Sequence, residues 1–235
     1  MTRSRIGRLV AMVAIPVLLT ACSAGSGAPV PTMPPITPAP PTAAPTHPGP
    51  TYQPGCPRSQ PDALGAGQTR TVTVTTDKGA IVIAIHADWS PIATGNFVTL
   101  ASCGYYDGVI FYRVARGFVI QGGDGMFGRS PNIYTDLVGS GGVPYTIKDE
   151  PVTQKYHRGT VAMARTVQAN SVTSQFFIVV DDSAAGPLAG PDHNNYQIIG
   201  EVTSGMDAVD KIVASADKEI PTNPVVMTKV TVSNP

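Results

Sequence analysis

The sequence predicts a mainly β fold: a closed barrel of short strands capped by two helices. Short apolar segments bounded by turn residues recur from residue 69 to the end of the chain. Only two segments carry apolar residues at helical spacing. The globular part, roughly 170 residues long, is large enough to bury one core. Many short strands with few helices are typical of barrels.

The strands are predicted from alternation and from short apolar runs. Residues 71–75 alternate threonine with valine, residues 76–79 form a turn, and residues 80–85 return as an apolar strand. A pair of strands is expected within residues 111–120. Further strands are expected at 161–164, 176–180, 197–202 and 225–232.

Each helix is predicted from its start and its apolar face. Ser90 and Pro91 are typical of an N-cap followed by the first helical position. This helix ends at Cys103 and Gly104, and its apolar side chains are Ile92, Phe97, Leu100 and Ala101. The second helix is expected over residues 204–214, with Met206, Val209, Ile212 and Val213 on its apolar face.

Residues 1–21 are predicted to be a signal peptide. Three arginines precede an apolar stretch at residues 9–19, which is too short to span a membrane comfortably. Residues 19–22 resemble a bacterial lipobox, which implies cleavage before Cys22 and a lipid on its thiol. The protein would then be exported and anchored to the outer face of the cell membrane. An ordinary secretory peptide or an uncleaved anchor is the alternative, and a secreted protein would follow if the lipobox is not used.

Residues 22–68 are predicted to form a tether rich in proline, threonine and alanine. Eleven prolines lie between residues 28 and 54, and no acidic residue occurs before Asp62. Such a segment cannot bury a core and favours extended polyproline geometry. We expect it to lift the domain at residues 69–235 off the membrane. A proline-rich ligand for a partner and a glycosylated stalk are the other interpretations.

The two remaining cysteines and the charge balance add two expectations. In an oxidising compartment Cys56 and Cys103 could form a disulfide that ties the tether to the domain, or both could remain free thiols. Loss of the three arginines of the signal peptide gives a mildly acidic chain without a basic run. The sequence therefore gives no indication of nucleic-acid binding.

The most informative motif lies within the predicted strand pair. Residues 111–124 are FYRVARGFVIQGGD, residues 163–164 are MA, and residues 174–178 are SQFFI. In these segments the chain resembles cyclophilin-type peptidyl-prolyl isomerases, whose pattern is FHRxxxGFxxQGGD followed by MA and SQFFI. The resemblance covers about residues 71–232. It implies an eight-stranded antiparallel cyclophilin barrel with a helix over each mouth, and catalysis that needs no cofactor or metal.

Isomerisation of an X–Pro bond requires stabilisation of a twisted amide. The resemblance implies that Arg113 is the fixed cation that donates hydrogen bonds to this amide. Gln121 would hold the substrate carbonyl or orient Arg113. A strand arginine that reaches solvent or pairs with Asp124, and a buried amide that supports the turn at residues 122–123, are the alternatives.

The predicted substrate contacts fall into three groups. Phe118, Val119, Phe177 and Leu188 are candidates for an apolar proline pocket. Ala164 and Arg165 match positions where the family holds the substrate main chain, and Gln175 matches the polar residue that faces residues before proline. Tyr196 lies where the family commonly has a histidine. Tyr112 and Val119 also depart from the family, in place of histidine and methionine.

The sequence therefore predicts a peptidyl-prolyl isomerase that assists the folding of exported proteins at the cell envelope. Its partners would be proline-containing polypeptides and, through the lipid, a membrane; the protein is expected to be a monomer. Because the pocket is altered, a binding module or chaperone with little turnover is the first alternative. A barrel whose motif serves only packing is the second.

Overall fold

Alternating side chains build the first hairpin. Along β1 (Thr69–Thr76) and β2 (Gly79–His86), Val72, Val74, Ile81 and Ile83 are fully buried, whereas the residues between them are more exposed. The computed structural model describes residues 52–189 and 196–234. The predicted signal peptide, Cys22 and most of the tether lie outside these residues.

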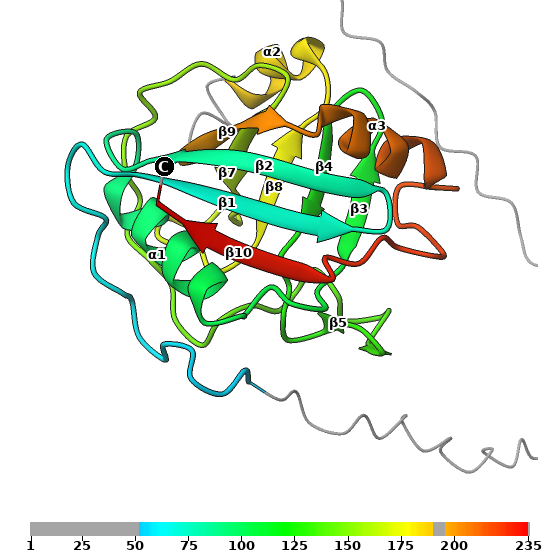
Figure 1. Cartoon of the computed structure of the whole chain (residues 1–235), viewed down its shortest axis with the longest axis horizontal. Coiled ribbons are helices and arrows are strands. Elements are labelled where there is room, and N and C mark those ends of the chain that lie inside the picture. The colour runs from blue at the N-terminus through cyan, green and yellow to red at the C-terminus, as the bar shows by residue number, and fades with distance from the viewer. Residues whose placement is uncertain (1–51, 190–195, 235) are drawn as a thin grey trace, which may run out of the picture. The chain divides into compact units, whose positions relative to one another are not determined.

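Eight strands form one sheet with the order β10-β1-β2-β9-β7-β8-β4-β3, and every ladder in it is antiparallel. The predicted mainly β, eight-stranded fold is thus confirmed (Figure 1). The other strands of this sheet are β3 (Phe111–Ala115), β4 (Val119–Gly122), β7 (Thr160–Met163), β8 (Phe176–Val179), β9 (Ile198–Ser204) and β10 (Lys229–Ser233). A small second sheet pairs β5 (Gly128–Arg129) with β6 (Asn132–Ile133).

The strand ladder is open between β3 and β10, the two edges of the sheet. Main-chain bonds from the segment before β10 span this gap: Val114 N donates to Glu219 O at 2.7 Å, and Phe111 N donates to Val225 O at 2.9 Å. The strand predicted at residues 225–232 therefore begins only at Lys229. Val225 and Met227 bond to the β3 side, whereas Thr228 N already donates to Thr75 O of β1, a change of partner that the sequence alone does not reveal.

Two longer helices lie at opposite ends of the sheet, α1 (Pro91–Ser102) and α3 (Met206–Ser215) (Figure 1). Ser90 is the N-cap of α1 as predicted, but its hydroxyl makes no capping bond. The Glu150 carboxylate accepts hydrogen bonds from Ile92 N at 2.8 Å and Ala93 N at 2.9 Å instead. A carboxylate at this position also complements the positive end of the helix dipole.

The start of α3 is set by a glycine. Gly205 has φ 93°, and a Cβ there would lie 2.1 Å from Ala80 O. Because only glycine fits this close approach, the chain turns here, and Ser204 belongs to β9 rather than to the predicted helix. A 3₁₀ turn (Asp182–Ala184) and a one-turn helix, α2 (Ala185–Leu188), follow β8 and were not predicted.

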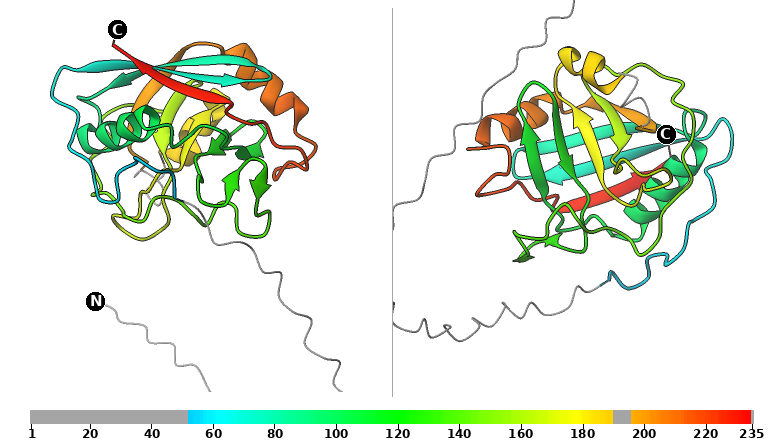
Figure 2. Two further views of the ribbon diagram at one scale, coloured as in Figure 1. Left: turned by 60° about the horizontal axis from the view of Figure 1, so that its bottom comes forward. Right: turned by 180° about the vertical axis from the view of Figure 1, so that it is seen from behind.

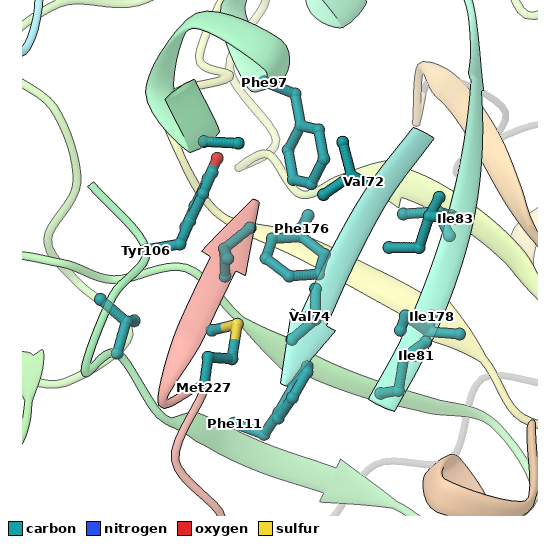
Figure 3. Packing of buried hydrophobic residues seen from close by; sticks show 14 of the residues in the cluster. Val72, Val74, Ile81, Ile83, Phe97, Tyr106, Phe111, Phe176, Ile178 and Met227 are labelled. Carbon is teal, nitrogen blue, oxygen red and sulfur yellow. The ribbon is translucent and has the colours of Figure 1, made fainter. Parts of the chain in front are cut away.

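The main core lies between the sheet and α1. Phe176 packs edge-on against Phe97, Tyr106 and Phe111, with ring centroids 5.2, 5.5 and 6.1 Å away (Figure 3). Such T-shaped pairs add to the stabilisation from burial. Phe177, the next residue, points to the other face of β8 and belongs to a separate apolar cluster.

Residues 52–68 pack on the domain. Cys56 and Cys103 form a disulfide with Cα atoms 5.3 Å apart. Leu64 N donates to Pro91 O at 2.9 Å, and a Cβ at Gly95 of α1 would lie only 2.3 Å from Asp62 O. The contacts therefore place this segment, which the sequence assigned to the tether, with the domain. Within the described ranges, no helix has the length and hydropathy needed to cross a bilayer.

Candidate active site

The hairpin of β3 and β4 places Arg113 opposite Gln121. These residues are register partners in the antiparallel ladder, so their side chains leave the same face of the sheet. Gly117 makes the connecting turn with φ 69°. On the far side of β4, Gln121 pairs in register with Phe177 of β8. Figure 2 shows β3, β4 and β8 side by side in its right view.

A buried amide network orients Gln121. Its side-chain N–H groups donate to the Tyr112 hydroxyl and to Gln175 Oε1, the latter at 3.1 Å. The Tyr112 hydroxyl donates to the same Gln175 oxygen at 2.5 Å. Both Gln121 donors are therefore used, and its oxygen has no partner among the described residues. These N–H groups are thus not available to a substrate carbonyl, and the orienting role toward Arg113 stays a prediction.

Tyr112 keeps its proton because of its environment. Burial raises the pKa of this phenol, and the nearby Asp124 carboxylate raises it further. The residue that departs from the family pattern thus remains a neutral hydrogen-bond donor. The sequence marked Tyr112 only as a departure and missed its bonds to Gln121 and Gln175.

Asp124 supports this network through main-chain hydrogen bonds to the loop that holds Gln175. Its buried carboxylate accepts four main-chain hydrogen bonds, from Met126, Phe127, Gly139 and Gly141, at 2.7–3.1 Å. Gln175 Nε2 donates to the carbonyls of Gly139 and Gly141 at 2.9 and 2.7 Å. Asp124 therefore fixes the loop that fixes Gln175, and it is not the partner of Arg113.

Arg113 is held by a residue that the sequence did not indicate. Its Nε and Nη2 both lie 2.7 Å from Oε1 of Glu219, in the loop after α3. The Arg113 side chain is 31% exposed and that of Glu219 is 57% exposed. Two of the five guanidinium N–H groups are thus occupied, and three are left for other acceptors.

The predicted apolar residues gather in one cluster on the outer face of β8. Phe118, Val119, Ala164, Phe177, Leu188 and Tyr196 all belong to it. However, Val119, Phe177 and Leu188 are each at most 3% exposed. The Tyr196 ring stands edge-on against Phe177 with a centroid distance of 5.3 Å. The side chains of Val119, Phe177 and Leu188 therefore form a buried layer, the covered floor of the cluster. The more exposed Phe118 and Tyr196 border this layer.

A cavity of about 500 Å³ adjoins this cluster. Four predicted site residues line it, namely Gln121, Ala164, Arg165 and Gln175, together with Met126, Val143 and residues 139–142, which the sequence did not indicate. The site residues thus divide between this cavity and the apolar cluster, which share Ala164. Arg113 is not among the residues that line this cavity.

Ala164 and Arg165, the two residues predicted to hold the substrate main chain, differ in whether their own main-chain groups are already paired. Ala164 N already donates to Gln175 O at 2.8 Å, so it cannot also bind a substrate carbonyl. The Arg165 side chain bonds to Asp149 at 3.0 Å and to the carbonyl of Gln168 at 2.7 Å. Its main-chain groups form no hydrogen bond to another described residue, and they lie beside the cavity.

A guanidinium with free donors, a fixed amide oxygen and an adjoining apolar cluster define a site for uncharged peptide groups. The family model of cyclophilin type peptidyl-prolyl cis-trans isomerases matches residues 71–232. The chain therefore belongs to the cyclophilin family, and its enzyme class is peptidyl-prolyl cis-trans isomerase.

Relatives agree with this assignment. A probable peptidyl-prolyl cis-trans isomerase of Brucella abortus (strain 2308) is 38% identical over 159 residues, 67% of this chain and 78% of the relative. Peptidyl-prolyl cis-trans isomerase B of Escherichia coli K12 is 36% identical over 69% of this chain and 99% of its own length. The crystal structure of a Cryptosporidium parvum cyclophilin type isomerase has a TM-score of 0.58 and 27% identity. It covers 71% of this chain and 99% of that one.

Proposed function

We propose that this isomerase acts on X–Pro bonds of exported proteins at the cell envelope, with Arg113 as the catalytic cation. The envelope location is supported by the predicted signal peptide, the lipobox ending in Cys22 and the proline-rich tether. A disulfide between Cys56 and Cys103 fits an oxidising compartment. The single observation that carries the catalytic part is the fixed Arg113 guanidinium opposite Gln121.

The mechanism needs no covalent step. Amide resonance imposes a barrier of about 18–20 kcal/mol on rotation of the X–Pro bond. As the bond twists, resonance is lost and the prolyl nitrogen gains a lone pair that can accept a hydrogen bond. The three free N–H groups of Arg113 can donate to this nitrogen and to a neighbouring carbonyl. A reduction of about 7 kcal/mol would correspond to roughly five orders of magnitude in rate.

The remaining residues bind and orient. The Gln121 oxygen faces the same side of the hairpin as Arg113 and can accept one of its N–H groups, which directs the others toward substrate. The apolar cluster around Phe118 and Tyr196 receives the proline ring. Residues before proline lie along the cavity, where the Arg165 main chain can pair with them.

A protease-coupled assay on a short Ala-Pro peptide tests the catalytic part. We expect Arg113→Ala to lower kcat/KM by about 100-fold or more, as removal of one oxyanion-hole donor does in other enzymes. Arg70→Ala is the matched control, because the Arg70 side chain on β1 bonds, within the described part of the chain, only to its near neighbours Thr69 and Gln68. Full activity of Arg113→Ala would refute the assignment.

A binding module with little turnover is the second candidate function. It is favoured by the covered floor, since Val119, Phe177 and Leu188 are almost inaccessible in this structure. The same assay, combined with a calorimetric measurement of peptide binding, separates the two functions. A wild-type protein that binds proline peptides in calorimetry yet leaves the isomerisation rate unchanged would be such a module.

A further inference from the structure

The strongest unexplained contact of the site is the one between Arg113 and Glu219. These residues are 106 positions apart in sequence. One carboxylate oxygen of Glu219 accepts a hydrogen bond from Arg113 Nε and forms an ion pair with Nη2, at 2.7 Å in both cases. This occupies one edge of the guanidinium and leaves the other end open. Neither the motif around Arg113 nor the proposed chemistry requires an acid in the loop after α3.

The loop that carries Glu219 is fixed to the catalytic hairpin by its main chain. Glu219 O accepts a hydrogen bond from Val114 N at 2.7 Å, and Ala216 O accepts one from Arg116 Nη2 at 2.6 Å. Within the loop, the Asp217 carboxylate accepts bonds from the main-chain N and the hydroxyl of Thr222 at 2.9 and 2.6 Å. Figure 1 shows the segment after α3 passing β3 before it enters β10. The position of Glu219 therefore does not depend on its own side chain.

We propose that Glu219 is a positioning residue of the isomerase. It fixes one edge of the Arg113 guanidinium, so that the three remaining N–H groups keep one direction while the amide twists. An arginine has a long side chain with many rotamers, and an unheld one at 31% exposure would sample several directions. Preorganised donors stabilise developing charge better than donors that must reorient. This proposal rests on the proposed role of Arg113.

The exposure of the pair limits the expected effect. Exposed ion pairs contribute at most about 1 kcal/mol, which is about fivefold in a rate. We therefore expect Glu219→Ala to lower kcat/KM by about fivefold, through kcat and with little change in KM. Glu219→Gln should retain most of the activity, because its amide oxygen can still accept both N–H groups. Glu201→Ala is the control: this carboxylate lies 3.6 Å from His157 in another surface pair and should have no effect.

A double-mutant cycle and an NMR signal separate positioning from a purely structural role. If Glu219 acts only through Arg113, Glu219→Ala should have no effect in an Arg113→Ala background. In ¹⁵N spectra, the Arg113 Nε–H signal should be sharp in the wild type and in Glu219→Gln, and broadened in Glu219→Ala.

The outcomes are distinct. Unchanged or increased kcat/KM in Glu219→Ala, with Arg113→Ala inactive, would overturn the positioning role and leave the proposed function intact. An equal loss in both backgrounds of the cycle would also overturn it, since Glu219 would then act through the fold. Full activity of Arg113→Ala would instead refute the proposed function itself.

Discussion

Buried tyrosines carry much of the polar structure beneath the site. Tyr112 links Gln121 to Gln175, while the Tyr106 hydroxyl donates to Ser174 O at 2.9 Å and the Tyr105 hydroxyl accepts from Ser174 Oγ at 3.1 Å. Each hydroxyl is paired, as buried polar groups must be. These phenols hold Ser174 and Gln175, which lead into β8, and Tyr106 and Tyr112 must stay protonated to donate their bonds.

The tyrosines predict a loss of stability in alkali. Burial raises the pKa of Tyr105 to about 12 and shifts the pKa values of Tyr106 and Tyr112 upward as well. An unfolded tyrosine titrates near pH 10, so roughly between pH 10 and 12 the unfolded chain binds fewer protons than the folded one. The contribution of these tyrosines to the free energy of unfolding is therefore fully present below about pH 10 and is lost as pH rises above it.

Melting temperatures measured from pH 8 to 11, with tyrosinate absorbance followed at 295 nm, test this expectation. Tyr105→Phe should reduce the slope of melting temperature against pH. A folded protein in which every tyrosine ionises near pH 10 without a change in melting temperature would contradict it.

At this scale the sequence indicated the candidate site residues better than their supports. Arg113 and Gln121 could be proposed because they lie in the motif that carries the resemblance to the cyclophilin family. Glu219 and the bonds of Tyr112 could not, since their partners arrive from loops and strands far away in sequence. Ala164 shows a further limit: the sequence does not reveal that its main-chain N–H is already paired with Gln175.

Among the elements, α1 shows how a distant residue can replace a local cap. Glu150 accepts main-chain hydrogen bonds from Ile92 and Ala93, whereas the Ser90 hydroxyl is buried and has no partner in the described structure. The sequence correctly predicted where the helix begins but assigned the capping bond to Ser90. Local spacing cannot reveal a carboxylate that reaches the helix from the loop before β7.

Two substitutions at the start of α1 should therefore differ in their effect on the free energy of unfolding. Glu150→Ala should lower the free energy of unfolding by about 1–2 kcal/mol, through lost capping and dipole interactions. Ser90→Ala should not lower it, because a buried hydroxyl without a partner destabilises the folded state. Urea unfolding of both variants measures the difference. A larger loss in Ser90→Ala than in Glu150→Ala would show that the serine, after all, is the functional cap.

Element boundaries were predictable where local pattern decides them. The hairpin of β1 and β2 follows its alternation of apolar and polar residues, as predicted. The start of β10 does not, because residues 225–227 pair with the β3 side and the strand begins only at Lys229. Edges of the sheet are thus settled by tertiary contacts rather than by propensity.

For the whole molecule, the disulfide determines where the tether joins the domain. Cys56 is bonded to Cys103 at the end of α1, and Tyr52 lies beside Tyr105 with ring centroids 6.3 Å apart. We predict that the proline-rich segment before Tyr52 is a tether, so that an isomerase site joined to it could meet polypeptides beyond a membrane surface.

Lipidation of Cys22 is tested by cell fractionation. We expect the wild-type protein in the membrane fraction and Cys22→Ser in the soluble or secreted fraction, with unchanged isomerase activity. Cys56→Ser combined with Cys103→Ser is the matched control and should remain in the membrane fraction. Membrane retention of Cys22→Ser would contradict the lipoprotein assignment and favour an uncleaved anchor.

The central claim is that Arg113 catalyses rotation of the X–Pro bond within a site that binds it. Exchange NMR on a labelled Ala-Pro peptide measures this directly, because the cis and trans signals exchange without any protease. Catalytic amounts of the wild-type protein should produce cis–trans exchange peaks. Arg113→Ala should abolish these peaks while the peptide's binding shifts persist. Binding shifts without exchange peaks in the wild type, or undiminished exchange in Arg113→Ala, would contradict the account.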